Sequence, residues 1–406
     1  MPSSPSARRW WALPTAIFIL TRIWLLAIPF GLLPYQAGTR VINDITLYEQ
    51  WARLLQSGQF PVNDQMWQYP PLIGPVLALG ALIPPDPTLG LVLLMLAFDT
   101  ATFVVLMRAV ARGAAIEGVW VWIAAAMLVG PVWLTRFDVV PSLFAVLALL
   151  AINRPVRSGI MMAIGALIKV WPALLLISVP RRSFGKALIA FLTTGLALLV
   201  TLSLTMQGVG SFASEQRARG LQVESIPAWL FLVGHHLGLD RTFIYRYGAM
   251  EVEAPGTRTV AAAIALIGLV GLALLAVARL TGRLDHASPA DIAMVVVLFS
   301  MVTSRVLSPQ YLVWVAAIAA VCLLDPATTM RPIVTLLMPV AALGQILYPM
   351  HYDWLFSDGL TGLAIQTVRV VLLVAATVWA SWRLIRPGRL ADPVRVEPVE
   401  QVGQTA

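Results

Sequence analysis

Asp44 is the residue best suited to acid–base chemistry, and Tyr48 is a candidate to bind substrate. Both lie in the first long polar stretch, at about 34–70. They are four residues apart and share a face if this stretch is helical. A carboxylate held near the membrane surface beneath other loops can act as a general base. The alternative is an ordinary solvated acid on an outer loop. Glu49 follows on the same segment and is a further candidate for substrate binding.

Lys169 is a cation in the middle of an apolar segment, Ser158 to Pro180. Burying a charge within a membrane span costs roughly 2.5–3.5 kcal/mol on the insertion scale, so the ammonium group needs a partner. Asp99, in another apolar run, could be a structural partner. A lipid phosphate is the functional alternative, which we favour.

Two outer turns supply further cations. Arg136-Phe137-Asp138 joins two apolar runs, where Arg136 and Asp138 could form a structural ion pair or Arg136 could bind a phosphate with its planar guanidinium. Arg305 is expected on the same side of the membrane. If Lys169 extends far enough, the three cations would approach one outward-facing site suited to a lipid phosphate or pyrophosphate.

Other polar and aromatic residues of the outer segments are candidates to contact substrate. Tyr69 precedes a Pro-Pro corner and could equally be an anchor at the headgroup level. The adjacent histidines His235 and His236 are a weak metal signal, and we expect neither a metal nor another cofactor. The remaining candidates are Arg219, Glu224, Gln310, Tyr311 and His351.

The elements that must position these residues are membrane helices. The 406 residues are 59% hydrophobic and 12% charged, with a net charge of +8 and a mean hydropathy of +0.82. Soluble domains are roughly half apolar and about 25% charged, so a soluble enzyme is excluded. The apolar runs are continuous, which predicts an all-α polytopic protein and excludes a transmembrane barrel. We expect about ten spans, at 11–33, 87–108, 118–135, 138–153, 186–206, 259–280, 289–305, 309–325, 332–350 and 360–385.

Arginines mark one set of segment ends and predict the orientation. These ends, which carry Arg108, Arg154, Arg181 and Arg383 among others, are expected in the cytoplasm together with both termini. The polar stretches at about 34–70 and 207–258 then face outward from the plasma membrane. Residues 1–386 would form one membrane domain, followed by a disordered cytoplasmic tail at 387–406.

The segment from Ser158 to Pro180 is basic at both ends, which does not fit one ordinary span. Pro172 follows Lys169 closely, and a proline breaks a helix. We therefore predict a hairpin of two half-helices meeting near Lys169, with a single span and a snorkelling lysine as the alternative. Residues 70–83 are apolar but too short to span with ease, so they would be interfacial or re-entrant.

The order of four motifs resembles glycosyltransferase family 87: Asp44 with Tyr48, then Tyr69-Pro70-Pro71, then Lys169-x-x-Pro172, then Ser308-Pro309-Gln310-Tyr311. The resemblance implies an integral membrane enzyme of the GT-C type whose external loops form the active site. It places Asp44 at the catalytic base, and Arg136, Lys169 and Arg305 at the donor phosphate. Some members have a histidine in the turn where this chain has Gln310 and Tyr311.

The function implied is inverting transfer of a sugar, most often mannose, from a polyprenyl-phosphate donor to a lipid-linked, glycolipid or lipoglycan acceptor outside the cytoplasm. An arabinofuranosyltransferase of the same type is the next alternative. A lipid or glycan transporter and a non-catalytic scaffold are two others. The expected partners are these substrates and membrane lipids. We expect no nucleic acid, because the positive charge is explained by topology.

Overall fold

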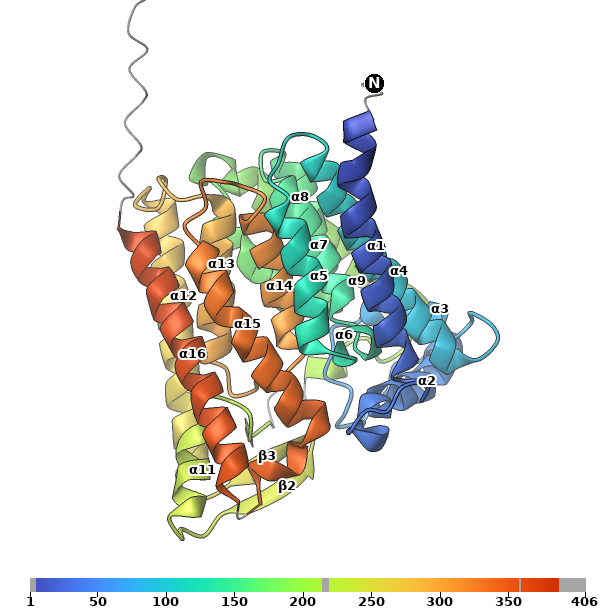
Figure 1. The fold of residues 1–406 in the computed structure, drawn as a ribbon, viewed down its shortest axis with the longest axis vertical. Helices are drawn as coiled ribbons and strands as arrows, with labels where there is room; N and C mark the ends of the chain where they lie inside the picture. The colour runs from blue at the N-terminus through green and yellow to red at the C-terminus, as the bar shows by residue number, and fades with distance from the viewer. Residues whose placement is uncertain (1–4, 214–218, 358, 387–406) are drawn as a thin grey trace, which may run out of the picture.

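The computed structural model describes residues 5–213, 219–357 and 359–386. Helices stand side by side along one direction, and α1 begins at the same end of the molecule where α16 finishes (Figure 1). Within the described residues, five helices are long and apolar enough to cross a membrane. They are α4 (Pro87–Val110), α9 (Arg181–Thr205), α12 (Thr257–Leu280), α15 (Arg331–Gln345, continued by the π-helix η3, Ile346–Met350) and α16 (Leu360–Ile385).

Shorter helices complete the bundle, and all except α8, which belongs to the predicted hairpin, fall where the remaining spans are expected. They are α1 (Pro5–Ala27), α5 (Glu117–Val129), α6 (Val132–Thr135), α7 (Val139–Leu150), α8 (Pro155–Ile168), α13 (Pro289–Val302) and α14 (Tyr311–Cys322). The all-α membrane architecture is thereby confirmed. The outer faces of α9 and α12 are lined with exposed leucines and isoleucines, as a lipid-facing surface requires.

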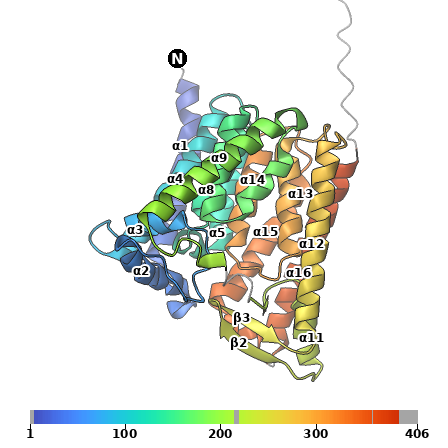
Figure 2. The same cartoon turned by 180° about the vertical axis from the view of Figure 1, so that it is seen from behind.

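The helix break near Lys169 is confirmed. Helix α8 ends at Ile168, Lys169 is extended (φ −155°, ψ 133°), and a 3₁₀ helix, η2 (Trp171–Ser178), follows with Pro172 in its first turn. Helix α9 then begins beside the start of α8 and runs alongside it in the same direction, across the face seen in Figure 2. The two helices are in close contact, because a Cβ on Gly159 would lie 2.2 Å from the carbonyl oxygen of Ala187. The hairpin thus holds Lys169 at its tip.

The two long polar stretches lie together at the end of the molecule opposite the start of α1 (Figure 1). The first holds η1 (Gly38–Val41), α2 (Asn43–Gln56) and, after an irregular loop, the eight-residue helix α3 (Ile73–Gly80). Helix α3 is too short to span, in agreement with the prediction for 70–83. Helix α2 buries Ile45, Tyr48 and Leu55 on one face.

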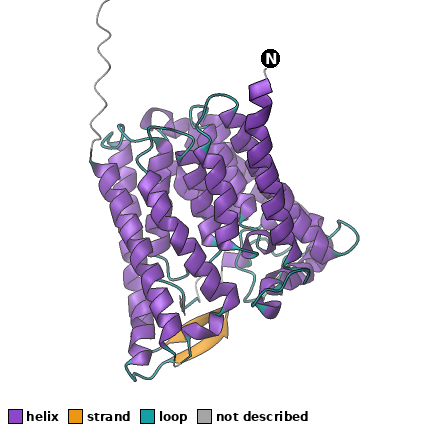
Figure 3. Ribbon diagram, in the orientation of Figure 1, coloured by secondary structure: helices purple, strands orange, loops and turns teal. Residues whose placement is uncertain are grey.

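The second polar stretch folds into the small sheet that Figure 3 shows at this end. Its strands are β1 (Leu221–Gln222), β2 (Thr242–Arg246) and β3 (Ala249–Glu253), antiparallel in the order β1-β3-β2, with Val252 of β3 facing Leu221 and Phe243. Helix α11 (Trp229–His236) lies between β1 and β2 in sequence. Residues 214–218, which precede β1, lie outside the described part.

Buried ion pairs tie the outer helices to the bundle. Arg22 of α1 binds Asp99 of α4, with Nε and Oδ2 2.8 Å apart, and the Trp133 indole donates to the same carboxylate at 2.9 Å. Asp99 is therefore not the partner of Lys169, which excludes the structural alternative considered for that lysine. The sequence could not assign the pairing, because an acid within one span can meet a cation on any neighbouring helix. The short 3₁₀ helix η4 (Tyr352–Leu355) follows η3 at the sheet end.

Candidate active site

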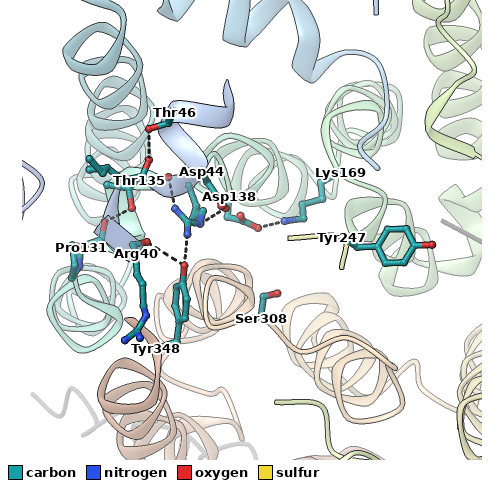
Figure 4. A network of polar contacts seen from close by, with 12 residues as sticks. Arg40, Asp44, Thr46, Pro131, Thr135, Asp138, Lys169, Tyr247, Ser308 and Tyr348 are labelled. Carbon is teal, nitrogen blue, oxygen red and sulfur yellow. Dashed lines mark hydrogen bonds and ion pairs between the residues drawn. The ribbon is translucent and has the colours of Figure 1, made fainter. Parts of the chain in front are cut away.

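Asp44 lies in the first turn of α2 and forms an ion pair with Arg136, which stands between α6 and α7. The Arg136 guanidinium also donates to the backbone oxygen of Thr135 at 3.1 Å and to the Tyr348 hydroxyl at 2.7 Å. Arg136 is only 2% exposed, so all these contacts are internal. Figure 4 shows Asp44, Asp138 and Tyr348 gathered at this point. Arg136 holds the Asp44 carboxylate in place.

A second pair lies next to the first. Lys169 Nζ is 2.7 Å from Oδ1 of Asp138, and the Trp314 indole donates to the same oxygen at 2.5 Å. Asp138 is thus the partner of Lys169 and not of Arg136, so a pair within the turn 136–138 is excluded. The two ion pairs bring together α2, the turn between α6 and α7, and the residue that follows α8. Figure 4 shows Asp44, Asp138 and Lys169 at this point.

Aromatic rings surround the Lys169 ammonium group. Its Nζ lies 5.0–5.7 Å from the ring centroids of Tyr69, Phe137, Tyr311 and Trp314. Such cation–π contacts stabilise a charge that has left water. Trp314 also stacks between Tyr311 and Trp171, with centroid distances of 3.9 and 5.4 Å. The stack offers flat apolar faces next to a cation.

Two cavities meet at Asp44. The larger, of about 490 Å³, is lined by Lys169, Tyr69, Arg219, Tyr311 and the Trp171–Trp314 stack, among others. The smaller, of about 230 Å³, is lined by Arg136, Glu224, Tyr348 and residues of the sheet. Both cavities share Asp44, Gly248, Ala249, Ser308 and Gln310. A group bound in either one therefore reaches the same carboxylate.

The ionisation of Asp44 follows from its surroundings. Its side chain keeps 23% of its surface exposed and lines both cavities, but the surrounding protein removes much of its hydration. Loss of hydration raises the pKa of Asp44 above the usual value for an aspartate, while Arg136 and then Lys169 act against this rise. A carboxylate with a raised pKa is a better proton acceptor once it is deprotonated.

Arg219 and Arg305 lie further along the cavity wall. Arg219 donates to Gln68 at 2.9 Å, lies 4.0 Å from Glu251, and lines the larger cavity. Arg305 lines a different cavity, of about 930 Å³, between the sheet and α12, which Arg219 also borders. The expected approach of Arg136, Lys169 and Arg305 to one site is therefore not found. Among the described residues, Arg219 and Lys169 are the cations that face the larger cavity.

Glu224 is part of a buried polar network. Its Oε1 lies 3.3 Å from Arg369 of α16, and its backbone oxygen accepts a hydrogen bond from Gln366 at 2.8 Å. Burial raises the pKa of Glu224 to about 7, and Arg369 acts against this rise. Gln222 connects the network to the turn before α14 by accepting a hydrogen bond from the Leu307 amide at 2.9 Å.

Besides Arg305 and Asp138, three further predicted site residues line neither of the two cavities at Asp44. Tyr48 is buried against Trp51 and Phe137. Glu49 accepts a hydrogen bond from Thr88. His351 stacks on Trp354, with ring centroids 3.8 Å apart. The side chains of Tyr48 and Glu49 point to neighbouring elements, because the α2 face that carries Tyr48 packs inward and Glu49 is the next residue around the helix.

Several residues at the site had not been singled out as candidates: Tyr348, Trp314, Trp171, Arg369 and Gln222. A signal was present for Trp314, which lies three residues after Tyr311 and so on the same helix face. Arg369 lies within a span and by the same physics as Lys169 required an acid. Nothing local marks Tyr348 or Gln222. Among the described residues no three His, Cys, Asp or Glu side chains gather as metal ligands would.

Comparison with known families and proteins gives one match. The model of glycosyltransferase family 87 matches residues 67–309, which is more than half of the chain. The match includes Tyr69, Arg136, Lys169 and Glu224, whereas Asp44 precedes it. No curated protein and no solved structure matches. The chain belongs to glycosyltransferase family 87 and is a membrane glycosyltransferase.

Proposed function

We propose that this enzyme transfers mannose from a polyprenyl-phosphate donor to a glycolipid or lipoglycan acceptor on the extracytoplasmic face, with inversion of the anomeric carbon. The observation that carries the proposal is the position of Asp44, which lines both cavities. A transferase needs two substrates to meet at one proton acceptor.

The donor would occupy the larger cavity. Lys169 and Arg219 face this cavity and supply positive charge for one phosphate. The stacked rings of Tyr311, Trp314 and Trp171 would cover the apolar face of the sugar or the first isoprene units. A lipid-linked donor suits an outward-facing site, because nucleotide sugars are held in the cytoplasm.

The acceptor would occupy the smaller cavity, where Glu224, Gln310 and Tyr348 offer hydrogen-bonding groups. Its attacking hydroxyl would lose a proton to Asp44. The resulting oxygen forms a bond to the anomeric carbon while the bond to the phosphate oxygen breaks, and the electron pair leaves with the polyprenyl phosphate. Lys169 and Arg219 stabilise the negative charge that grows on this leaving group.

The test is transfer from radiolabelled polyprenyl-phosphate-mannose by the purified enzyme in detergent, with a membrane lipid extract as the acceptor source. We expect label in a new glycolipid, with an anomeric configuration opposite to that of the donor by NMR. The same reaction with GDP-mannose should give no product. Transfer from polyprenyl-phosphate-arabinofuranose alone would replace mannose by arabinose. A product of retained configuration would overturn the inverting mechanism.

A further inference from the structure

A large basic cavity lies at the end of the molecule opposite the active site. It has a volume of about 1120 Å³ and is bordered by α4, α7, α8 and the two loops that connect them to their neighbours. Four arginines line it: Arg108 and Arg112 at the end of α4, and Arg154 and Arg157 at the start of α8. This is the end at which α1 begins (Figure 1).

The four arginines differ from others at the same end. None of their guanidinium groups forms a hydrogen bond or an ion pair with another described residue. By contrast, Arg331 binds Glu117 at 3.2 Å, Arg279 binds Asp285 at 3.3 Å, and Arg383 donates to the Thr329 carbonyl at 3.1 Å. Glu117 and Asp285 are therefore already engaged, and the charge of the four arginines is left for a ligand.

The backbone adds to this positive charge. Helix α8 is 14 residues long, begins at Pro155, and no side chain caps its first turn. The amides at the start of a helix favour an anion. The helix start coincides with Arg154 and Arg157, so side-chain and backbone donors border the same cavity.

The other wall of the cavity is apolar. It is formed by Val105 of α4, Leu147 and Leu150 of α7, and Met161 of α8. The side chain of Leu150 is 42% exposed. A soluble anion would gain nothing from such a wall. A ligand with a charged head and an alkyl chain would satisfy both halves of the cavity.

We infer that this cavity binds the phosphate headgroup of an anionic phospholipid from the leaflet opposite the active site, with its acyl chain against the Leu147–Leu150 wall. The site is separate from the catalytic cavities, and the inference does not depend on the proposed donor. It goes beyond the general excess of arginine on one side of a membrane protein, which requires no cavity and no apolar wall.

The test is a titration of the purified full-length enzyme with phosphatidylglycerol, followed by native mass spectrometry. Two variants remove the site, Arg108→Gln/Arg112→Gln and Arg154→Gln/Arg157→Gln. The control, Arg182→Gln/Arg283→Gln, removes two exposed arginines at the same end that do not line the cavity. Because each arginine near an anionic lipid contributes about fivefold, we expect each site variant to bind roughly 30-fold more weakly and the control to be unchanged.

Leu150→Glu is a further variant in which no arginine is removed. It places a carboxylate beside the guanidinium groups and should weaken binding as strongly as the double variants. Equal binding of phosphatidylcholine, or an equal loss in the control, would overturn the proposal in favour of general surface charge. Competition by glycerol phosphate as strong as by the lipid would show a soluble phosphate site and would also overturn it.

Discussion

The Arg136 guanidinium has two effects on the Asp44 carboxylate. Arg136 fixes the position of the carboxylate through an ion pair, and it also counteracts the rise in pKa that burial causes. Because the proposed base must be deprotonated to act, the pair sets the lower pH limit of activity. Lys169 also counteracts the rise in the pKa of Asp44, but more weakly than Arg136 does.

Replacing Arg136 should move the acid limb of the pH profile. In the wild type, kcat/KM should fall as the pH drops through the raised pKa of Asp44. Arg136→Gln removes the charge that lowers this pKa, so the fall should occur at higher pH. The measurement is kcat/KM against pH for both proteins. Arg246→Gln, which removes a cation from an exposed pair on the sheet, should leave the profile in place. An Arg136→Gln profile displaced to lower pH would contradict this role of Arg136.

Lys169 should act mainly on donor binding. Loss of one charge-assisted hydrogen bond to phosphate costs about 1.5–3 kcal/mol, so Lys169→Gln should raise the KM for the donor by roughly 10- to 150-fold. Lys169→Arg keeps the charge and should recover part of this loss. Steady-state kinetics with varied donor separates KM from kcat. An unchanged KM in Lys169→Gln would remove Lys169 from the donor site.

At the scale of single residues, the sequence showed which side chains need a charged partner more reliably than it showed which residue that partner is. Lys169 stood out because a cation in an apolar segment requires compensation. Its partner could not be chosen between Asp99 and an external phosphate, and the structure gives Asp138. Asp138 and Lys169 are 31 residues apart and Asp44 and Arg136 are 92 apart, and such pairings depend on how the helices pack.

The hairpin of α8 and η2 is the element that positions Lys169. Helix α8 lies against α9 over a glycine contact, and Gly165 similarly allows Pro172 of η2 to approach, with a Cβ there 3.0 Å from the proline ring. The ends of the two half-helices are thereby held together, and Lys169 projects from the junction toward Asp138.

Gly159→Ala should loosen this element. The added methyl group would lie against the Ala187 carbonyl, so α8 must move away from α9, and overpacking of this kind costs about 1–3 kcal/mol. We expect a lower midpoint of thermal unfolding in detergent, and a reduced kcat/KM because Lys169 shifts. Gly185→Ala, in α9 with no atom within 4 Å of the added carbon, is the matched control and should be neutral or stabilising. Equal midpoints in both variants would contradict the tight α8–α9 contact.

Hydropathy predicted the membrane helices well where the apolar runs are long and continuous. The expected spans agree with α4, α9, α12 and α16 to within a few residues, because apolar length is a local property. The sheet of β1, β2 and β3 was not predicted. Its strands have two to five residues, and its pairing of Leu221 with Val252 is a long-range contact without a local pattern.

For the whole molecule, both polar stretches lie at one end and the beginning of α1 and the end of α16 at the other (Figure 1). The two cavities of the candidate active site lie at the first end, and the basic cavity lies at the second. This separation agrees with the orientation that the arginine pattern predicts, in which the catalytic end faces outward.

Cysteine labelling tests this orientation. The chain has one cysteine, Cys322, which is fully buried and should remain unlabelled. We expect a membrane-impermeant maleimide to label Asp240→Cys in intact cells, because Asp240 is exposed at the sheet end. Arg283→Cys, exposed at the opposite end, should react only after the membrane is opened. The reverse pattern would place the active site in the cytoplasm and contradict a lipid-linked donor outside.

The most direct test of the central claim compares Asp44→Asn with the wild type. Asparagine keeps the size of the side chain and can still accept a hydrogen bond from Arg136, but it cannot take a proton at neutral pH. We predict that transfer from polyprenyl-phosphate-mannose falls by about 10²- to 10⁴-fold while binding of polyprenyl phosphate persists. Asp240→Asn, an exposed carboxylate of the same end, should transfer at the wild-type rate. Transfer by Asp44→Asn at the wild-type rate would show that Asp44 is not the base.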